Sequence, residues 1–434
     1  MATVIERDKN RYEVVKVLNP DDQVLNVAIT APLTGDPTAA TDAFGRQRVS
    51  NPLTLFDSSH RYRDNGLWNS STANGGTVTF QANEGLVNLD VTTTSGSLAY
   101  RETTKVFSYQ PGKSLLILNT FVMSPAKTGL RQRVGYFGDD NGMYIELNNS
   151  TLSFVERSIS SGSFSESRIA QANWNVDKMD GDGPSKVVLD ITKSQILWMD
   201  IEWLGLGSVR MGFVIDGRFI PCHVFHHANR ILSTYISTGS LPLRYEIENT
   251  AATASNSKLK QVCSSVISEG GYELRGAQLS VQTPIGSPRD LTTALTYYPA
   301  ISIRLKASPD RLDAIVILTA LSILAITNNA NYNWQVVATG TTTGGTWVSA
   351  GADSAVEYNI TGTSFTGGRV LASGFLNGSN QGSTPVDILK EALFSFQLER
   401  NNFTSTPYEL TLAAASDTNG ADIYASMDFE EISR

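Results

Sequence analysis

The chain has 434 residues, of which only 18% are charged, and its two cysteines exclude a scaffold held together by disulfides. The formal net charge of −8 is opposite in sign to that of proteins that bind nucleic-acid duplexes, so we expect no nucleic-acid partner. Charges stand among the first ten residues where a secretory signal has its apolar run, and no apolar stretch reaches the ~20 residues of a membrane-spanning helix, so we expect neither secretion nor membrane insertion.

Residues 1–52 differ in pattern from the rest of the chain. Two short apolar runs, 14–18 and 24–29, are interrupted by Asn19-Pro20 and followed by a stretch rich in Pro, Thr, Ala and Gly. Because this segment has too few apolar residues to bury a core of its own, we predict an extended arm that becomes ordered against neighbouring subunits. The alternative is that it adds edge strands to the domain that follows.

Residues 53–276 alternate apolar and polar side chains with the period of two that is typical of β-strands. The alternating runs 78–82 and 87–91 flank Asn83-Glu84-Gly85 and predict a hairpin, and Asp216-Gly217 predicts a tight hairpin turn. Many short strands at this spacing indicate an antiparallel β-sandwich. Further strands are predicted at 114–123, 131–137, 143–147, 151–157, 186–192, 195–204, 208–215, 218–225, 241–248 and 260–268.

A third block begins near Ala277 and extends to residue 434. After a Pro- and Gly-containing linker at 283–288, alternation resumes, and the last alternating run is 423–429. The apolar stretch 314–326 is predicted to be a buried strand, and 385–394 is predicted to be a short helix that Pro385 begins. The predicted fold is therefore all-β, with two antiparallel β-sandwiches at 53–276 and 277–434 behind the N-terminal arm.

The best enzymatic candidate is the sequence Trp198-Met-Asp-Ile-Glu-Trp203. On a strand, Asp200 and Glu202 would point to one face about 7 Å apart, as a catalytic acid and base require. Sandwich-fold glycoside hydrolases with a similar pattern carry a third acid two residues earlier as the nucleophile, and that position is Trp198 here. We therefore predict no enzyme activity and interpret both acids as part of a solvated sheet face.

Two clusters suggest metal ligands. Cys222, His223, His226 and His227 are close in sequence, but adjacent residues of a strand project to opposite faces, so they cannot all reach one ion. The acidic turn 177–182 and residues 139–141 lack the spacing of a calcium loop and are interpreted as turn chemistry. We predict no metal and no cofactor. Cys222 and Cys263 are expected to be buried free thiols.

Tryptophans outside a core can stack on sugar rings. Trp174 and Trp203 are the candidate glycan contacts, although a tryptophan of a β-sandwich belongs more often to the core.

The junction between the arm and the first sandwich, Thr41-Asp-Ala-Phe-Gly-Arg-Gln-Arg-Val-Ser-Asn-Pro-Leu-Thr-Leu-Phe-Asp-Ser58, resembles a stretch of virion structural proteins from tailed bacteriophages of aquatic bacteria and cyanobacteria. Three later passages, 172–184, 212–217 and 263–272, are similar to the same group. The resemblance covers roughly residues 40–276 and, more weakly, the remainder. It implies a concanavalin-like or jelly-roll sandwich and a component of the phage particle, and it brings no catalytic residues.

We therefore expect a homo-oligomeric structural protein on the exterior of the virion, most simply a trimer, made in the host cytoplasm. Head decoration, head fibre, tail and baseplate locations all remain open. The alternatives are a module that binds host glycans through Trp174 and Trp203, and a polysaccharide depolymerase that uses Asp200 and Glu202. The arm is expected to contact the particle or sister subunits through Val14, Val15, Leu18, Val24, Val27, Phe44, Arg46 and Arg48.

Overall fold

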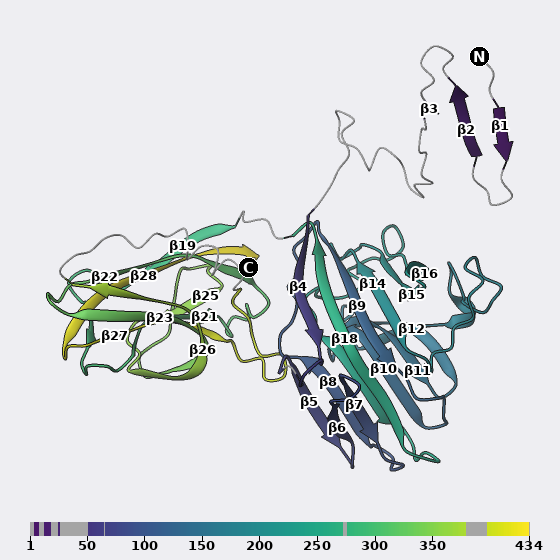
Figure 1. The fold of residues 1–434 in the computed structure, drawn as a ribbon, viewed down its shortest axis with the longest axis horizontal. Helices are drawn as coiled ribbons and strands as arrows, with labels where there is room; N and C mark the ends of the chain where they lie inside the picture. The colour runs from purple at the N-terminus through teal and green to yellow at the C-terminus, as the bar shows by residue number, and fades with distance from the viewer. Residues whose placement is uncertain are drawn as a thin grey trace. The chain divides into compact units, whose positions relative to one another are not determined.

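The structure, a computed structural model, describes residues 51–64, 66–271, 276–378 and 397–433 and the backbone of three short strands before them (Figure 1). The chain divides into two compact units, Met1–Asn51 and Pro52–Arg434. In the first unit, a sheet is ordered β1 (Val4–Arg7), β2 (Glu13–Leu18), β3 (Leu25–Asn26), with antiparallel pairing.

In the second unit, residues 52–271 form a sandwich of two antiparallel sheets. The seven-stranded sheet has the order β13 (Ser165–Ala170), β12 (Thr151–Ser158), β11 (Gly142–Asn148), β10 (Leu130–Phe137), β17 (Leu243–Asn249), β8 (Leu98–Thr103), β5 (Trp68–Ala73). The eight-stranded sheet has the order β16 (Arg218–Phe225), β15 (Val209–Ile215), β14 (Gln195–Ile201), β9 (Ser114–Val122), β18 (Ser257–Glu269), β7 (Leu86–Val91), β6 (Thr77–Gln81), and β4 (Pro52–Ser59) pairs with β18.

One apolar core fills the space between these two sheets. Ile117 and Phe121 of β9 enter it from the eight-stranded sheet, and Val134 and Tyr245 enter it from the seven-stranded sheet. Their neighbours along each strand point the other way, because successive side chains of a strand alternate between faces. Every second residue of these strands therefore enters the core, as the alternation in the sequence predicted.

Both predicted hairpins are confirmed. β6 pairs with β7 so that Val78 lies opposite Leu89, and β15 pairs with β16 across the turn Asp216-Gly217. Asp216 and Gly217 have φ angles of 51° and 74°, as a two-residue hairpin turn that follows the strand twist requires.

The predicted strand 186–192 is wrong. This segment holds one isolated bridge, at Val188, and a turn at residues 191–192, and the rest of it has no regular structure. Lys186 has a φ of 59°, outside the strand region, and the Asp190 carboxylate accepts hydrogen bonds from the backbone N–H and hydroxyl of Thr192 at 3.0 and 2.6 Å. The predicted strand 195–204 ends early, at Ile201, and Leu204 has a φ of 37° in the turn that follows.

Residues 277–433 contribute two further antiparallel sheets with a second core between them. The four-stranded sheet has the order β19 (Ala277–Gln282), β28 (Ala421–Ser433), β20 (Arg289–Leu291), and β22 (Ile315–Ala325) also pairs with β28. The six-stranded sheet has the order β24 (Val348–Ser349), β25 (Val356–Asn359), β21 (Tyr298–Leu305), β27 (Glu409–Ser416), β23 (Asn331–Thr343), β26 (Ser364–Asn377).

The apolar stretch 314–326 is a strand, β22, but it is buried only in part: Ile315–Leu318 are buried, whereas Leu324 is 47% exposed. The last alternating run is β28, whose Ile423, Met427 and Phe429 are fully buried. The helix predicted at 385–394 lies outside the described residues. Among the described residues, no helix has the length and apolar character needed to cross a membrane. Cys222 is buried and Cys263 is half-buried, and both are free thiols.

A loop between β26 and β27 reaches the first sandwich. Asn402 donates a hydrogen bond of 2.6 Å to Glu102 of β8, and the Phe403 ring stacks on Tyr100 with centroids 5.7 Å apart. Lys105 forms an ion pair of 2.8 Å with Glu399 of the same loop. This loop therefore joins the second sandwich to one end of the seven-stranded sheet.

The alternation in the eight-stranded sheet predicts how two isoleucines differ. Ile117 of β9 is fully buried, whereas Ile196 of the adjacent β14 is 39% exposed. We expect Ile117→Ala to lower the free energy of unfolding by about 3 kcal/mol, since it leaves a cavity, and Ile196→Ala to lower it by less than about 1 kcal/mol. Chemical denaturation measures both; equal losses would contradict the assigned faces.

Candidate functional site

The outer face of the seven-stranded sheet carries charged residues. On β17, Tyr245 and Ile247 enter the core, so Arg244, Glu246 and Glu248 lie on the opposite face. Glu246 is only 2% exposed although it does not face the core. We name this surface the charged face and define it by five of its charged residues, Arg133, Arg157, Arg244, Glu166 and Glu246.

Glu246 lies between two arginines. It forms ion pairs with Arg133 of β10 and, at 2.7 Å, with Arg244 of its own strand. Burial by itself would raise the pKa of Glu246, but the positive charges of Arg133 and Arg244 outweigh it and lower that pKa to about 2. Glu246 is therefore a carboxylate and not a proton donor near neutral pH.

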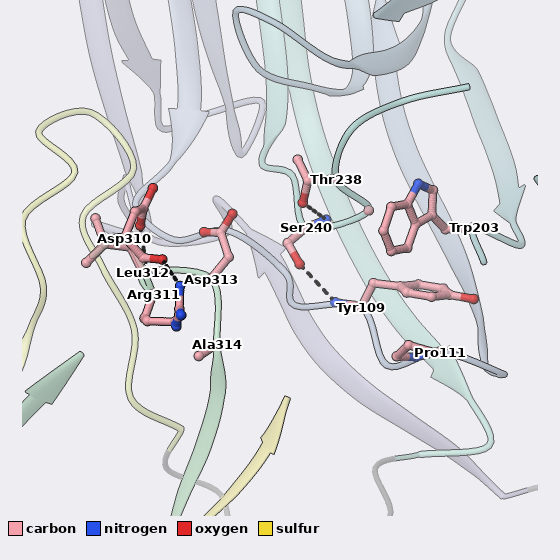
Figure 2. Close-up of a pocket in the computed structure, with 11 residues that line it drawn as sticks. Tyr109, Pro111, Trp203, Thr238, Ser240, Asp310, Arg311, Leu312, Asp313 and Ala314 are labelled. Atoms are coloured by element: carbon pink, nitrogen blue, oxygen red, sulfur yellow. Dashed lines mark hydrogen bonds between the residues drawn. The ribbon is translucent and has the colours of Figure 1, made fainter. Parts of the chain in front are cut away.

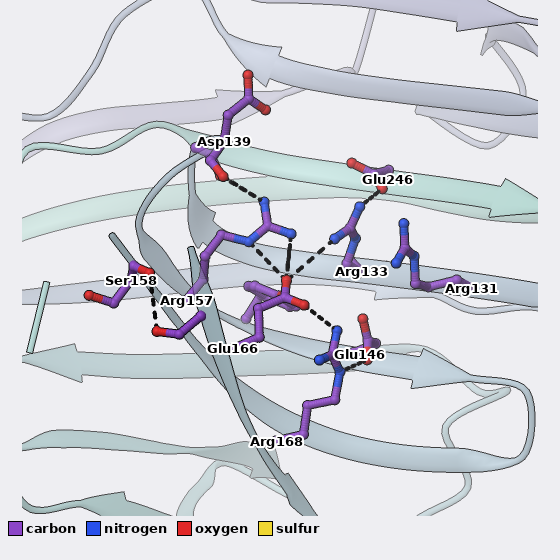
Figure 3. Close-up of polar contacts among 12 residues, drawn as sticks. Arg131, Arg133, Asp139, Glu146, Arg157, Ser158, Glu166, Arg168 and Glu246 are labelled. Atoms are coloured by element: carbon purple, nitrogen blue, oxygen red, sulfur yellow. Dashed lines mark hydrogen bonds and ion pairs between the residues drawn. The ribbon is translucent and has the colours of Figure 1, made fainter. Parts of the chain in front are cut away.

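Glu166 of β13 is the second centre of the charged face (Figure 3). It accepts hydrogen bonds from Arg157 at 2.7 Å and from the Tyr144 hydroxyl at 2.5 Å, and it pairs with Arg168. Burial opposes ionisation of Glu166, but the bonds from Tyr144 and Arg157 lower its pKa to about 2. Burial also raises the pKa of Tyr144 to about 12, so this phenol stays protonated.

Phe137 occupies the centre of the charged face. The guanidinium carbons of Arg133, Arg157 and Arg244 lie 5.9, 5.4 and 5.5 Å from the centre of its ring. Cations at this distance are attracted to the negative face of an aromatic ring. Each of these arginines therefore contacts the Phe137 ring and forms an ion pair with Glu166 or Glu246. The charges of the charged face are thus paired with one another.

A cleft of about 330 Å³ opens beside this sheet (Figure 2). Trp203 and Tyr109 form its aromatic side, with ring centroids 5.7 Å apart and an interplanar angle of 83°. The loop before β22 forms the opposite side with Asp310, Arg311 and Asp313. The cleft therefore combines aromatic rings with carboxylates and a guanidinium.

A second hollow of about 240 Å³ adjoins the cleft and shares Thr238, Ser240 and Asp313 with it. It extends to Glu102 and Asp139, which bind Arg244 at 2.6 and 2.8 Å. The cleft is thus continuous with the end of the charged face.

Trp203 is held in the wall of the cleft by its surroundings. Its indole N–H donates a hydrogen bond of 3.2 Å to the Ile236 carbonyl oxygen, and the backbone of Gly239 packs against one side of the ring. A Cβ at position 239 would lie 3.0 Å from Cγ of Trp203, so a larger residue there would push the ring by a few tenths of an ångström. Trp203 is half-buried and lines the cleft, and its role as a glycan contact stays a prediction.

Trp174 is placed differently, which corrects its assignment as a candidate glycan contact. It is 3% exposed and stacks on Phe154 with centroids 4.4 Å apart, and its N–H donates a hydrogen bond to the Ile169 carbonyl oxygen. Because its ring is inside the sandwich core, it has no open face on which a sugar could stack.

The two acids of the enzymatic candidate, Asp200 and Glu202, lie in different environments. Asp200 is 5% exposed, pairs with Arg210, and has a raised pKa because it is buried, although Arg210 opposes the shift. Glu202 is exposed and lies beyond the end of β14. Neither residue lines the cleft.

The cysteine and histidines near the end of β16 do not converge. Cys222 points into the core, and its burial raises the pKa of its thiol. His223 accepts a hydrogen bond from the Asn175 backbone N–H at 3.3 Å, while His227 lies 2.7 Å from Glu156. Across the described ranges, no group of three or more His, Cys, Asp or Glu side chains is placed to hold a metal ion.

The acidic turn is held by backbone hydrogen bonds. Asp177 accepts bonds from the N–H groups of Met179 and Ser185 at 2.8 and 2.7 Å, and Asp180 accepts one from Asp182 at 3.0 Å. These contacts are the turn chemistry that the sequence indicated.

The expected assembly contacts fall on the first unit. Val14, Val15 and Leu18 belong to β2, of which the structure describes the backbone. The other five lie outside the described residues: Val24, Val27, Phe44, Arg46 and Arg48.

No protein-family model and no curated protein sequence matches this chain. Solved structures with a similar fold include the CBM2 module of an evolved Dit protein from Lactobacillus casei BL23 phage J-1, at 5% identity and a TM-score of 0.35, which covers 52% of this chain and 100% of that chain. Arcelin-5, a lectin-like defense protein from Phaseolus vulgaris, has 8% identity and a TM-score of 0.31 over 51% of this chain and 99% of that chain.

A glycoside hydrolase family protein from Mycobacterium thermorestibile has 12% identity and a TM-score of 0.34, and covers 49% of this chain and 99% of that chain. All of these likenesses are weak, so the ligands and activities of those proteins are not transferred to this chain.

Sequence reasoning missed the charged face. The available signal was on β17, where Arg244, Glu246 and Glu248 stand at every second position between residues of the core. Charges that alternate with buried residues mark one face of a strand, but Arg133 and Arg131, the partners of Glu246 and Glu248, lie on another strand, β10.

Two glutamates on the same face of β17 provide a test of the charged face. Replacing Glu246 by Gln leaves the buried Arg133 without its closest counter-charge and removes one of the three carboxylates that pair with Arg244, and we expect a loss of about 3 kcal/mol in the free energy of unfolding at pH 7. Glu248→Gln breaks the more exposed pair with Arg131 and should cost less than about 1 kcal/mol.

Denaturant titration compares the two variants. Losses of similar size would show that Glu246 is no more important than a surface ion pair.

Proposed function

We propose that this protein is an oligomeric structural component on the exterior of a tailed-bacteriophage particle, attached through residues 1–51. The resemblance of residues 40–276 to virion structural proteins motivates the proposal. The observation that carries the attachment role is the division of the chain at Asn51, which makes the first 51 residues a unit separate from the two sandwiches.

A low content of charge suits this role. Subunits that pack in many copies present polar, weakly charged surfaces that neither repel one another nor aggregate, and only 18% of these residues are charged. The short sheet β1–β3 has edge strands with which another subunit can pair. The two sandwiches would then project from the particle.

Deleting residues 1–48 tests the attachment. We expect the remaining chain to fold, because β4 begins at Pro52 and both cores lie beyond it, but to be absent from particles assembled in its presence. Circular dichroism checks the fold and immunoblotting of purified particles checks incorporation. Incorporation equal to that of the full chain would contradict the proposal.

The position of the protein on the particle can be found with an antibody against residues 277–434, which gold labelling makes visible in the electron microscope. Label on the head would indicate a decoration or fibre protein, and label at the tail tip would indicate a role in host recognition. Absence of label from intact and disrupted particles would exclude a virion protein.

A second function is favoured by the cleft itself: binding of host glycans. Sugar sites combine an aromatic ring, which stacks on the apolar face of the sugar, with planar polar groups that bind its hydroxyls. The half-buried Trp203 provides a ring on one side of the cleft, and Asp310, Arg311 and Asp313 provide polar groups on the other.

We propose binding without hydrolysis. A glycosidase needs a pair of carboxyl groups at the sugar site, and the two acids of the enzymatic candidate, Asp200 and Glu202, do not line the cleft. Host polysaccharide should therefore keep its chain length after prolonged incubation with the protein.

A glycan array tests binding at the cleft. We expect Trp203→Ala to reduce binding by about fivefold or more, since loss of an aromatic stacking partner costs about 1–3 kcal/mol. Trp347→Ala is the matched control, because Trp347 packs against Arg304 and does not line the cleft. A uniformly blank array, or equal binding by the two variants, would exclude this function.

A further inference from the structure

His227 is buried between two hydrogen-bond acceptors. Its Nδ1 lies 2.5 Å from the Gly207 carbonyl oxygen and its Nε2 lies 2.7 Å from Oε2 of Glu156. The residue is only 4% exposed, and its ring stacks on Tyr235 at 4.0 Å with an interplanar angle of 6°. Both ring nitrogens are therefore committed to protein partners.

Only the protonated ring satisfies both contacts. A carbonyl oxygen and a carboxylate accept hydrogen bonds, and a neutral imidazole has a single N–H, so one nitrogen lone pair would face an oxygen. The imidazolium donates from both nitrogens. Burial lowers the pKa of His227, but its bonds to Glu156 and to Gly207 outweigh burial and raise the pKa above the ordinary value of 6.5.

Gly207 connects His227 to the cleft. The N–H groups of Leu206 and Gly207 donate to the Trp203 carbonyl oxygen at 3.0 and 2.8 Å, which closes a tight turn over residues 203–207. The same turn accepts a bond from the Tyr235 N–H at the Gly205 carbonyl oxygen, at 3.0 Å. Trp203 thus stands at the start of a turn whose end is held by His227.

We propose that protonated His227 is a positioning residue that holds Trp203 in the wall of the cleft, and that its deprotonation loosens the turn and weakens sugar binding. This inference rests on the glycan-binding function proposed for the cleft. It makes the cleft a site that binds best in mildly acidic to neutral conditions.

The other charged and titratable groups around the imidazolium come from four elements. Glu156 belongs to β12, and Glu202 precedes the turn and accepts a 3.5 Å bond from the Tyr235 hydroxyl at its carbonyl oxygen. Burial raises the pKa values of Tyr235 and Tyr109, so both phenols stay neutral over the range in which His227 titrates. His226 points elsewhere, with its Nδ1 3.5 Å from Ser208 Oγ.

The linkage between protonation of His227 and folding sets the direction in which its contribution to stability changes with pH. Because the folded-state pKa of His227 is raised, its contribution is fully present below the ordinary value of 6.5 and is lost as the pH rises through the higher folded-state pKa. His60 and His223 act in the opposite direction, since burial lowers the pKa of each to about 4. Differences between wild type and a His227 variant therefore isolate this contribution.

The experiment begins without ligand. The fluorescence of Trp203, taken as the difference between the wild type and Trp203→Phe, is followed from pH 5 to pH 9. We expect a single-proton change with a midpoint above 6.5. His227→Gln, which cannot carry the charge, should abolish the change, and the control His226→Gln should retain it.

Glu156→Gln provides a second variant if His227→Gln does not fold. Removing the carboxylate should move the midpoint to lower pH, a shift that a purely structural role of Glu156 would not produce. A midpoint that is the same in wild type and Glu156→Gln, or a pH profile that His227→Gln leaves unchanged, would overturn the inference.

The final step measures binding of a glycan found on the array. We expect affinity to fall about tenfold as the pH rises through the midpoint in wild type and His226→Gln, and to stay nearly constant in His227→Gln. No binding at any pH together with an intact fluorescence step would reject the glycan function and leave the positioning role of His227. If the wild type binds the glycan with the same affinity at every pH, the proposed role of His227 in positioning Trp203 for binding is rejected.

Discussion

Both faces of the seven-stranded sheet are buried along its central strands β10, β11 and β17, and this constrains how these strands pair. One face supplies Val134, Tyr245 and Ile247 to the sandwich core, and the other supplies the ion pairs of Arg133 and Glu246. Because successive side chains alternate, a slip of one residue would move a guanidinium into the apolar core and an apolar side chain into the charged face. Neither exchange is tolerable, so the strands can pair in only one register.

The same constraint reaches the cleft. Arg244 is held by Glu246 on its own strand and binds Glu102 and Asp139, which line the hollow beside the cleft. The charged face therefore fixes the polar end of the site, while the turn that follows β14 places Trp203 at the aromatic end. A rigid sheet with functional residues on the loops at its margin is a common way to build a binding site.

The sequence predicted those features that depend on neighbours along the chain. Alternation located β9, β10, β16 and β28, and Asp216-Gly217 located a hairpin because its φ angles are a local property. Alternation failed at 186–192, where the Asp190 side chain binds the backbone in competition with strand pairing.

Features that depend on tertiary contacts were not accessible in this way. Trp174 and Trp203 look alike in sequence, yet one packs on Phe154 in the core and the other lines a cleft. Arg133 and Glu246 are 113 residues apart, so no local pattern pairs them. The polar side of the cleft comes from residues 310–313, which the sequence assigned to a different domain.

The loop between β26 and β27 makes the two sandwiches energetically interdependent. Asn402 and Phe403 cover Glu102 and Tyr100, and Lys105 binds Glu399, so melting of the second sandwich would uncover a buried carboxylate of the first. Loss of those contacts lowers the stability of the first sandwich. Melting of the first sandwich likewise removes the same contacts from the second and lowers its stability. Residues 52–434 should therefore unfold with greater cooperativity than two independent domains joined by a linker. In a fragment that stops before residue 397, the first sandwich would be less stable than it is in the whole chain.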